Sequence, residues 1–150
     1  MRALILVVSA TLATLLAGCT ASGPIYSQAA APMGEQALVY LYRVRTPFGA
    51  WVPMKVEVNG KEIGILANDS YTTVYVPAGE VSLSATRWQD FHYPDSKRVS
   101  VSGRVAAGET YYLRISQSRS GSMITTNLER VSAVEADPEL RVLKRAEPVK

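Results

Sequence analysis

The chain has 150 residues with one histidine and one cysteine, and its 16 basic against 13 acidic side chains give a net charge of +3. A histidine-based metal cluster and an internal disulfide are therefore excluded, and no basic stripe typical of a nucleic-acid-binding protein is present. The length fits a single domain, which must be held together by its own hydrophobic core.

The N-terminus has the pattern of a bacterial lipoprotein signal peptide. The basic start Met1-Arg2 precedes an uncharged apolar run over residues 3–16, which is too short to span a membrane. The run ends in Leu16-Ala17-Gly18-Cys19, a small-residue cleavage site followed by the only cysteine. We expect residues 1–18 to be removed and Cys19 to become the lipid-bearing N-terminus.

Lipidation at Cys19 would hold the protein on a membrane of the bacterial cell envelope. Thr20 follows the cysteine, where an aspartate favours retention at the inner membrane, so the periplasmic face of the outer membrane is the favoured location in a Gram-negative cell. Residues 19–36, rich in Ala, Ser, Gly and Pro, are predicted to be the lipidated cysteine and a flexible tether.

Between Ala37 and Val131 the hydrophobic pattern changes to the period of two that is typical of β-strands. The predicted strands are Ala37–Val44, Met54–Val58, Lys61–Leu66, Tyr71–Val76, Glu80–Arg87, Lys97–Val105, Thr110–Gln117 and Ser122–Val131. Asn59-Gly60 is a strong hairpin signal, because both residues tolerate positive φ. About eight short strands without intervening helical patterns predict an all-β domain over residues 37–131, an antiparallel Ig-like or PEGA-like β-sandwich.

The C-terminal tail, residues 132–150, has the one helical signal after the signal peptide. Asp137-Pro138-Glu139 offers an N-cap, a proline at the first helical position and an acid in the first turn. The pattern predicts a short helix over Pro138–Arg145, which either docks on the sandwich or frays.

The order of several motifs is similar to a family of small bacterial lipoproteins known as a domain of unknown function. These motifs are Val39-Tyr40-Leu41-Tyr42-Arg43, Val56-x-Val58-Asn59-Gly60-x-x-Ile63-Gly64, Tyr71, Val76-Pro77-Ala78-Gly79 and Gly108-x-x-Tyr111-Tyr112-Leu113. Val58–Ser84 also resembles the PEGA-type surface module, although its turn reads Pro77-Ala78-Gly79-Glu80. The resemblance implies a β-sandwich at the cell envelope and no catalytic residues.

Signals for an enzyme are weak. No phosphate-binding loop, dinucleotide fingerprint or zinc-protease motif is present, and we expect no cofactor and no metal. Asp90-x-His92 is readable as an orienting pair for a nucleophilic serine, which leaves an unrecognised hydrolase as one alternative. A polar loop histidine is the simpler interpretation of His92.

Strand parity predicts the position of a binding face. If strand direction alternates, the tight turns gather at one end, and Arg45–Pro53, Ala67–Ser70, Trp88–Ser96 and Ser118–Gly121 gather at the other. Aromatic rings on loops suit recognition of a partner. The candidate binding face at this second end comprises Phe48, Trp51, Trp88, Phe91, His92, Tyr93 and Arg119, with Arg45 and Arg87 nearby. The alternative for the tryptophans is that they cap the core.

The predicted first strand begins at the tight-turn end, so the tether is expected to attach there and the aromatic end to face away from the membrane. The leading hypothesis is a non-catalytic binding module whose partner is an envelope protein or a glycan such as peptidoglycan. Exposed strand edges at Ala37–Val44 or Ser122–Val131 offer a second way to bind a partner. A structural or assembly lipoprotein without a discrete ligand site is the alternative.

Overall fold

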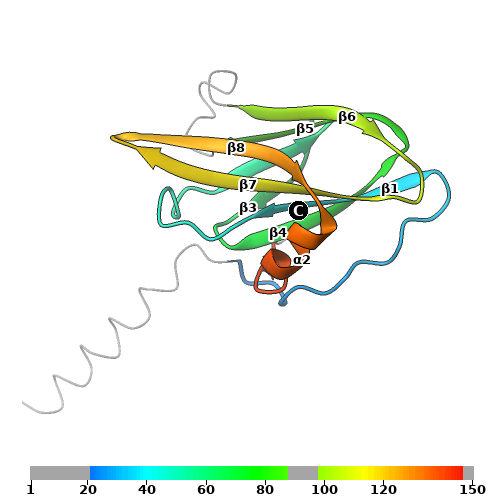
Figure 1. Ribbon diagram of the computed structural model, residues 1–150, viewed down its shortest axis with the longest axis horizontal. Helices are drawn as coiled ribbons and strands as arrows, with labels where there is room; N and C mark the ends of the chain where they lie inside the picture. Colours follow the sequence, from blue (N-terminus) through cyan, green and yellow to red (C-terminus); the bar gives the residue numbers. More distant parts are fainter. Residues whose placement is uncertain (1–20, 88–97, 147–150) are drawn as a thin grey trace, which may run out of the picture.

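The computed structural model describes residues 21–87 and 98–146, which form two β-sheets packed face to face with a short helix on one outer face (Figure 1). The first sheet has the strand order β8-β7-β1-β4-β9 and the second β3-β2-β5-β6. The predicted β-sandwich is confirmed. The predicted residues Cys19 and Leu16-Ala17-Gly18 lie outside the described residues.

The strand bounds of the first sheet are β1 Gln36–Arg43, β4 Ser70–Pro77, β7 Thr110–Ser120, β8 Met123–Val131 and β9 Lys144–Arg145. Those of the second sheet are β2 Met54–Val58, β3 Lys61–Leu66, β5 Gly79–Arg87 and β6 Val99–Val105. The pairing is antiparallel except for β1 with β7 and β4 with β9, which run parallel. The β1–β7 pair is parallel because both are odd-numbered strands and the chain reverses direction at each connection from β1 to β8.

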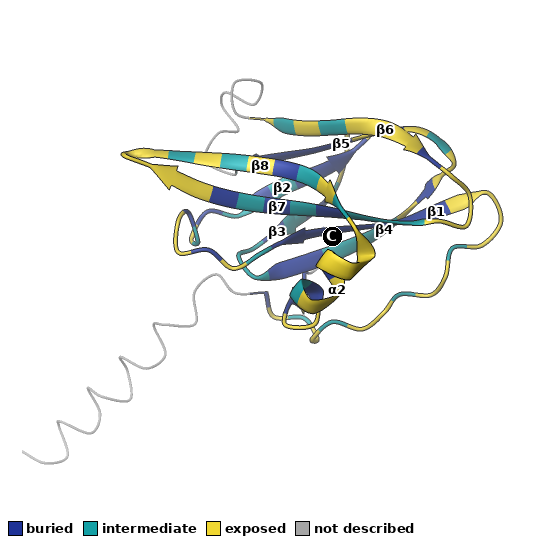
Figure 2. Ribbon diagram, in the orientation of Figure 1, coloured by how far each residue is buried: buried dark blue, intermediate teal, exposed yellow. Residues whose placement is uncertain are grey.

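The core lies between the sheets and follows the predicted alternation. The inward positions of β5, Val81, Leu83 and Ala85, are buried, as are Leu113 and Ile115 of β7. Figure 2 shows the buried residues concentrated in the middle strands, with β6 and the tip of the β7–β8 hairpin more exposed. Val99 and Val101 of β6 are only half-buried because β6 is an edge strand.

Strand parity places the described connections as predicted, while the predicted loop Trp88–Ser96 lies outside the described residues. The tight turns at residues 59–60, 78 and 106–109 lie at one end, and Asn59 and Gly60 both have positive φ, 49° and 77°. Residues 44–53, 67–69 and the hairpin at 121–122 lie at the other end, here called the loop end. The predicted loop Ser118–Gly121 is shorter than expected, because β7 continues to Ser120.

The outer face of the first sheet is covered by the two segments that flank the sandwich domain in sequence. Tyr40 and Tyr71 of this face pack against Tyr26, with ring centroids 6.0 and 5.3 Å from its own. The backbone N–H of Ala29 donates a hydrogen bond of 2.7 Å to Tyr40 Oη. This packing differs from the flexible tether expected over residues 19–36, because tyrosine rings bury apolar area against each other and still use their hydroxyl groups.

The C-terminal tail docks on the same face through α2 (Ala133–Leu140). Ala136 and Leu140 are buried there, together with Leu143 beyond the helix. The predicted helix Pro138–Arg145 is wrong at both ends, since Ser132 is the N-cap and the helix ends at Leu140 before the short strand β9. A capping box between Ser132 and Glu135 begins the helix five residues earlier, because it satisfies two backbone donors at once.

The predicted attachment of the N-terminal segment at the tight-turn end is also wrong. Ile25 forms a β-bridge with Lys144, and the N–H of Arg145 donates to Pro24 O at 2.9 Å. β9 itself pairs with Ser70 and Tyr71 at the start of β4. Residues 24–25 are therefore held near the loop end, and the chain runs back along the outer face to reach β1 (Figure 1).

The structure also separates the two strand edges suggested from the sequence. β1 has no free edge, because it is hydrogen-bonded to β4 on one side and to β7 on the other. β8 is an edge strand, as suggested for Ser122–Val131.

Candidate functional site

A buried arginine organises the loop end. Arg43 is the last residue of β1, and its side chain is fully buried. Its Nη1 donates to Val52 O at 2.6 Å, and its Nη2 donates to Gly49 O and to Gln117 Oε1, both at 2.7 Å. Two of these three acceptors are backbone carbonyls of the 44–53 loop. Arg43 therefore fixes the backbone path of that loop from its buried side.

Arg43 makes no ion pair with any described residue, and its Nε has no hydrogen-bond partner there. Burial lowers the pKa of the Arg43 guanidinium to about 10, so the side chain stays charged at neutral pH. A buried charge is costly unless its donors are satisfied. The three short hydrogen bonds offset that cost, and they do so only while the loop keeps this conformation.

Gln117 of β7 is the second member of this network. While its Oε1 accepts from Arg43, its Nε2 donates to Thr126 Oγ1 of β8 at 3.2 Å. Gly49 has a φ of +65°, and a Cβ built there would lie 3.1 Å from Gln117 Oε1. Glycine therefore suits this position for both its backbone conformation and its close approach to the glutamine.

Two further residues join this loop to the 67–69 connection. The N–H of Thr46 donates to Asn68 Oδ1 and Asn68 Nδ2 donates to Thr46 O, both at 3.1 Å. Thr46 Oγ1 in turn accepts from the N–H of Phe48 at 3.2 Å. Arg45 Nε lies 3.8 Å from Asp69 Oδ2, but this ion pair near the surface contributes little to the stability of the loop. The loop is thus fixed by paired polar groups along its first half.

This fixed loop presents apolar rings to solvent. Trp51 is 63% exposed and Phe48 is 38% exposed, whereas their neighbours Val52 and Gly49 are buried. The alternative that Trp51 caps the core is therefore wrong. Large exposed rings next to a polar rim are typical of recognition surfaces.

The structure supports part of the predicted binding face. Phe48 and Trp51 lie on one loop, and the exposed Arg119 lies in the neighbouring hairpin, where its Nε donates to Gly121 O at 2.6 Å. Trp88, Phe91, His92 and Tyr93 lie outside the described residues. Sequence reasoning missed Arg43, Gln117, Thr46 and Asn68. A signal for Arg43 was present, namely a charged residue at the end of an otherwise apolar strand.

A second polar cluster joins α2 to the first sheet. Tyr42 Oη donates to Glu139 Oε2 at 2.5 Å, and Arg114 contacts Glu139 and Glu129, each at 2.9 Å. Burial, followed by the bond to Glu139, raises the pKa of Tyr42 far above its ordinary value. This cluster is structural: Glu139 joins α2 to Tyr42 and Arg114 of the sheet, and Arg114 also pairs with Glu129 of the neighbouring strand β8.

A third cluster surrounds Glu57 on the outer face of the second sheet. Lys55 Nζ lies 2.7 Å from Glu57 Oε1, while Arg98 Nη2 and Ser84 Oγ lie 3.3 and 3.1 Å from Oε2. Burial opposes ionisation of this carboxyl, but the bonds from Lys55 and Ser84 and the charge of Arg98 outweigh it and lower the pKa. Glu57 is thus a carboxylate whose charge is neutralised within the sheet.

Within residues 21–87 and 98–146 there is no group of three His, Cys, Asp or Glu side chains that would hold a metal ion. No helix of that part of the chain is long and apolar enough to cross a membrane.

Comparison with known proteins gives a family but no further relative. No curated protein and no solved structure matches the chain. A family described as "Protein of unknown function (DUF2846)" matches residues 34–127. This confirms the predicted resemblance to a domain of unknown function, whereas the PEGA-like resemblance of Val58–Ser84 stays a prediction. The match extends from the turn before β1 into β8, and the chain therefore belongs to the DUF2846 family.

Proposed function

We propose that this protein is a membrane-anchored envelope lipoprotein that acts as a non-catalytic binding module through its loop end. The observation that carries the proposal is the Arg43 network. A buried charge holds two backbone carbonyls of a loop whose Trp51 ring is left in solvent. Fixing a loop before binding reduces the entropy lost on association. A fixed loop that carries exposed aromatic rings suits recognition of a partner.

The anchor would lie close to this end. Gly23 approaches β9 so closely that a Cβ there would lie 2.2 Å from Arg145 O, and Arg145 is held beside Tyr71. Cys19 precedes Ala21 by two residues, which span at most about 7 Å. A lipid on Cys19 would therefore hold the loop end toward the membrane, instead of away from it as the sequence had suggested.

This orientation favours an envelope protein at the membrane surface as the partner. A binding site beside the lipid anchor is less suited to peptidoglycan, the other partner suggested by the sequence. Aromatic rings and arginine together are enriched at the centres of protein–protein interfaces, and here Trp51 and Phe48 have Arg45 and Arg119 at the same end.

Site-specific photocrosslinking in intact envelopes tests the proposal. A photoreactive amino acid at Phe48 should give a crosslinked protein that is lost when Trp51→Ala is added. The matched control is the same amino acid at Val134 of α2, which is 85% exposed. Identical products at Phe48 and Val134, or none at Phe48, would contradict a site at the loop end and leave the purely structural role.

A further inference from the structure

No described strand pairs with the outer edge of β6 in the second sheet. The N–H of Ser82 donates to Asn59 Oδ1 at 2.8 Å, and its C=O accepts from the N–H of Asn59 at 2.7 Å. Both groups of Ser82 therefore point away from β6. Ser82 and Ser102 are opposite each other in the antiparallel β5–β6 pair. Because they form a non-hydrogen-bonded pair, the N–H and C=O of Ser102 point away from β5, toward the open edge. By alternation Ser100 and Arg104 also direct their backbone groups to the open edge.

This edge lacks two of the usual protections against added strands. Edge strands are commonly blocked by a proline or by a charged residue that points inward. β8, the edge of the first sheet on the same side of the sandwich, carries Arg130 in an inward-facing position opposite Leu113. β6 reads VSVSGRV and has neither device, because its inward positions are valines and Gly103. Of these two edges, β6 is the more open to pairing.

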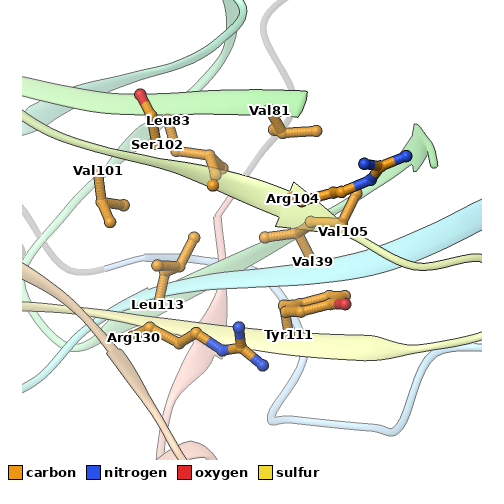
Figure 3. A pocket seen from close by; sticks show the side chains of 11 residues that line it. Val39, Val81, Leu83, Val101, Ser102, Arg104, Val105, Tyr111, Leu113 and Arg130 are labelled. Carbon is orange, nitrogen blue, oxygen red and sulfur yellow. The ribbon is translucent and has the colours of Figure 1, made fainter. Parts of the chain in front are cut away.

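A hollow lies directly beside the edge. Gly103 faces the interior opposite Val81, and a Cβ built on it would have nothing within 4 Å. The missing side chain leaves a cleft of about 110 Å³ that opens between the sheets. Apolar side chains from both sheets surround it, as Figure 3 shows for Val39, Val81, Leu83, Val101, Val105 and Leu113.

The size and the rim of this hollow restrict what it would bind. Pockets that enclose a drug-sized ligand measure roughly 300–1,000 Å³, so this hollow fits a single apolar side chain. Its rim is cationic, with the Arg130 guanidinium 4.5 Å above the Tyr111 ring and Arg104 on β6. Neither arginine forms an ion pair with another described residue. A second copy of the chain would bring the same cations, whereas an acidic partner would neutralise them.

We propose that the β6 edge binds an extended, acidic segment of a partner protein, which adds a fifth strand to the second sheet. Its backbone pairs with Ser100, Ser102 and Arg104, one apolar side chain fills the hollow beside Gly103, and an acidic side chain contacts Arg104 or Arg130. In this mode backbone bonds supply affinity and the hollow supplies specificity. The site is separate from the loop end and goes beyond the function proposed above.

A library of random peptides of roughly nine residues, displayed on phage and selected against the full chain, provides the probe. We expect alternating apolar positions with acidic residues among the enriched peptides. Binding of the most enriched peptide is then measured by fluorescence anisotropy. Ser102→Pro removes one outward N–H without disturbing β5, and Gly103→Leu fills the hollow. Each should weaken binding by at least about tenfold.

Matched controls separate binding from folding. Ser102→Thr keeps the N–H and should bind as the wild type does, and Gly103→Ala should have an intermediate effect. Thermal unfolding shows whether each variant is folded. Amide hydrogen exchange gives a second measurement that needs no variant, because the amides of Ser100, Ser102 and Arg104 should become protected when the peptide binds. Arg130→Gln should reduce both affinity and its salt dependence.

Enrichment of no peptide, or equal binding by the wild type, Ser102→Pro and Gly103→Leu, would overturn the proposal. Peptides whose binding is lost with Trp51→Ala and kept with Ser102→Pro would belong to the loop end, so failure here is distinguishable from failure of the proposed function. Displacement of the peptide by laurate, with Ser102→Pro binding normally, would make the hollow a lipid site and would also overturn it.

Discussion

Arg43 and Gln117, 74 positions apart in the sequence, are joined by a 2.7 Å hydrogen bond between Nη2 and Oε1 inside the protein. The bond connects β1 and β7, which are neighbouring parallel strands, and the same Nη2 also holds Gly49 O. One guanidinium thus links the core of the first sheet to the loop that carries Trp51. The shape of the loop end depends on this side chain.

Replacing Arg43 with Met should destabilise the protein and release the loop. Three buried acceptors lose their donor, and each unsatisfied group costs about 1–3 kcal/mol, so we expect a loss of about 2–4 kcal/mol in the free energy of unfolding after partial relaxation. Urea denaturation measures this loss, and amide exchange at Val52 reports loop opening. The exposed Arg119→Met is the control and should change stability by less than about 0.5 kcal/mol. Equal stability of Arg43→Met and the wild type would show that the network is not needed.

Glu57 makes stability depend on acid pH. Its folded pKa is below the ordinary value of 4.5, so the unfolded chain binds more protons than the folded one in the window between the two. Its contribution is therefore present above pH 4.5 and is lost as the pH falls through the folded pKa. Unfolding free energy, measured from about pH 6 to about pH 3, should fall less steeply in Glu57→Gln than in the wild type.

Two outcomes would contradict this assignment of the acid dependence. Glu57→Gln should also lower stability at neutral pH, because Lys55 and Arg98 lose their carboxylate partner. An acid slope unchanged by Glu57→Gln, or one equally reduced by the exposed control Glu80→Gln, would place the dependence on other carboxyl groups.

The elements that local patterns determine were predictable from the sequence. Alternation of apolar residues along Glu80–Arg87 identifies β5, and Asn59-Gly60 identifies the β2–β3 turn through its two positive φ angles. Strand parity then follows from the order of the turns. These features depend on residues within a few positions of one another, which is why the β-sandwich and the loops at the loop end can be predicted from the sequence.

The features that were missed depend on contacts between distant segments. Nothing near Arg43 indicates that its acceptor is Gln117, and nothing in residues 21–35 has a period that predicts packing. Tyr26 packs against Tyr40 and Tyr71, which lie side by side on the outer face, and its N–H donates to Leu143 O at 2.9 Å. Proline is a strong local signal and predicts a helix start at Pro138, whereas the Ser132–Glu135 capping box determines the start.

Tyr42→Phe should loosen α2 while leaving the sandwich intact. The substitution removes the hydroxyl that donates to Glu139, and a hydrogen bond to a charged group contributes about 1.5–3 kcal/mol. Amide exchange of Ala136 and Leu140 should accelerate more than that of Leu41 in β1. Ser132→Ala, which removes the helix cap, should act in the same direction by about 1 kcal/mol. Uniform acceleration across β1 and α2 would show that the helix does not open separately.

The raised pKa of Tyr42 adds an alkaline prediction for the same contact. The folded protein keeps the phenol proton above pH 10, where the unfolded chain loses it, so stability should decrease as the pH rises beyond the ordinary tyrosine pKa of 10. This decrease should be smaller in Tyr42→Phe.

The position of Trp51 relative to the membrane tests the whole arrangement of anchor and loop end. In the lipidated chain reconstituted in vesicles that contain brominated phospholipids, Trp51 should be quenched, because the chain enters the domain at Gly23, beside the loop end. Trp88→Phe leaves Trp51 as the remaining tryptophan. Gly23→Val should reduce the quenching, since its side chain clashes with Arg145 O and releases the segment from β9. Cys19→Ser, without the lipid, should show no quenching. An unquenched Trp51 in the lipidated protein would mean that the loop end is free to face away from the membrane, where a glycan partner becomes the better expectation.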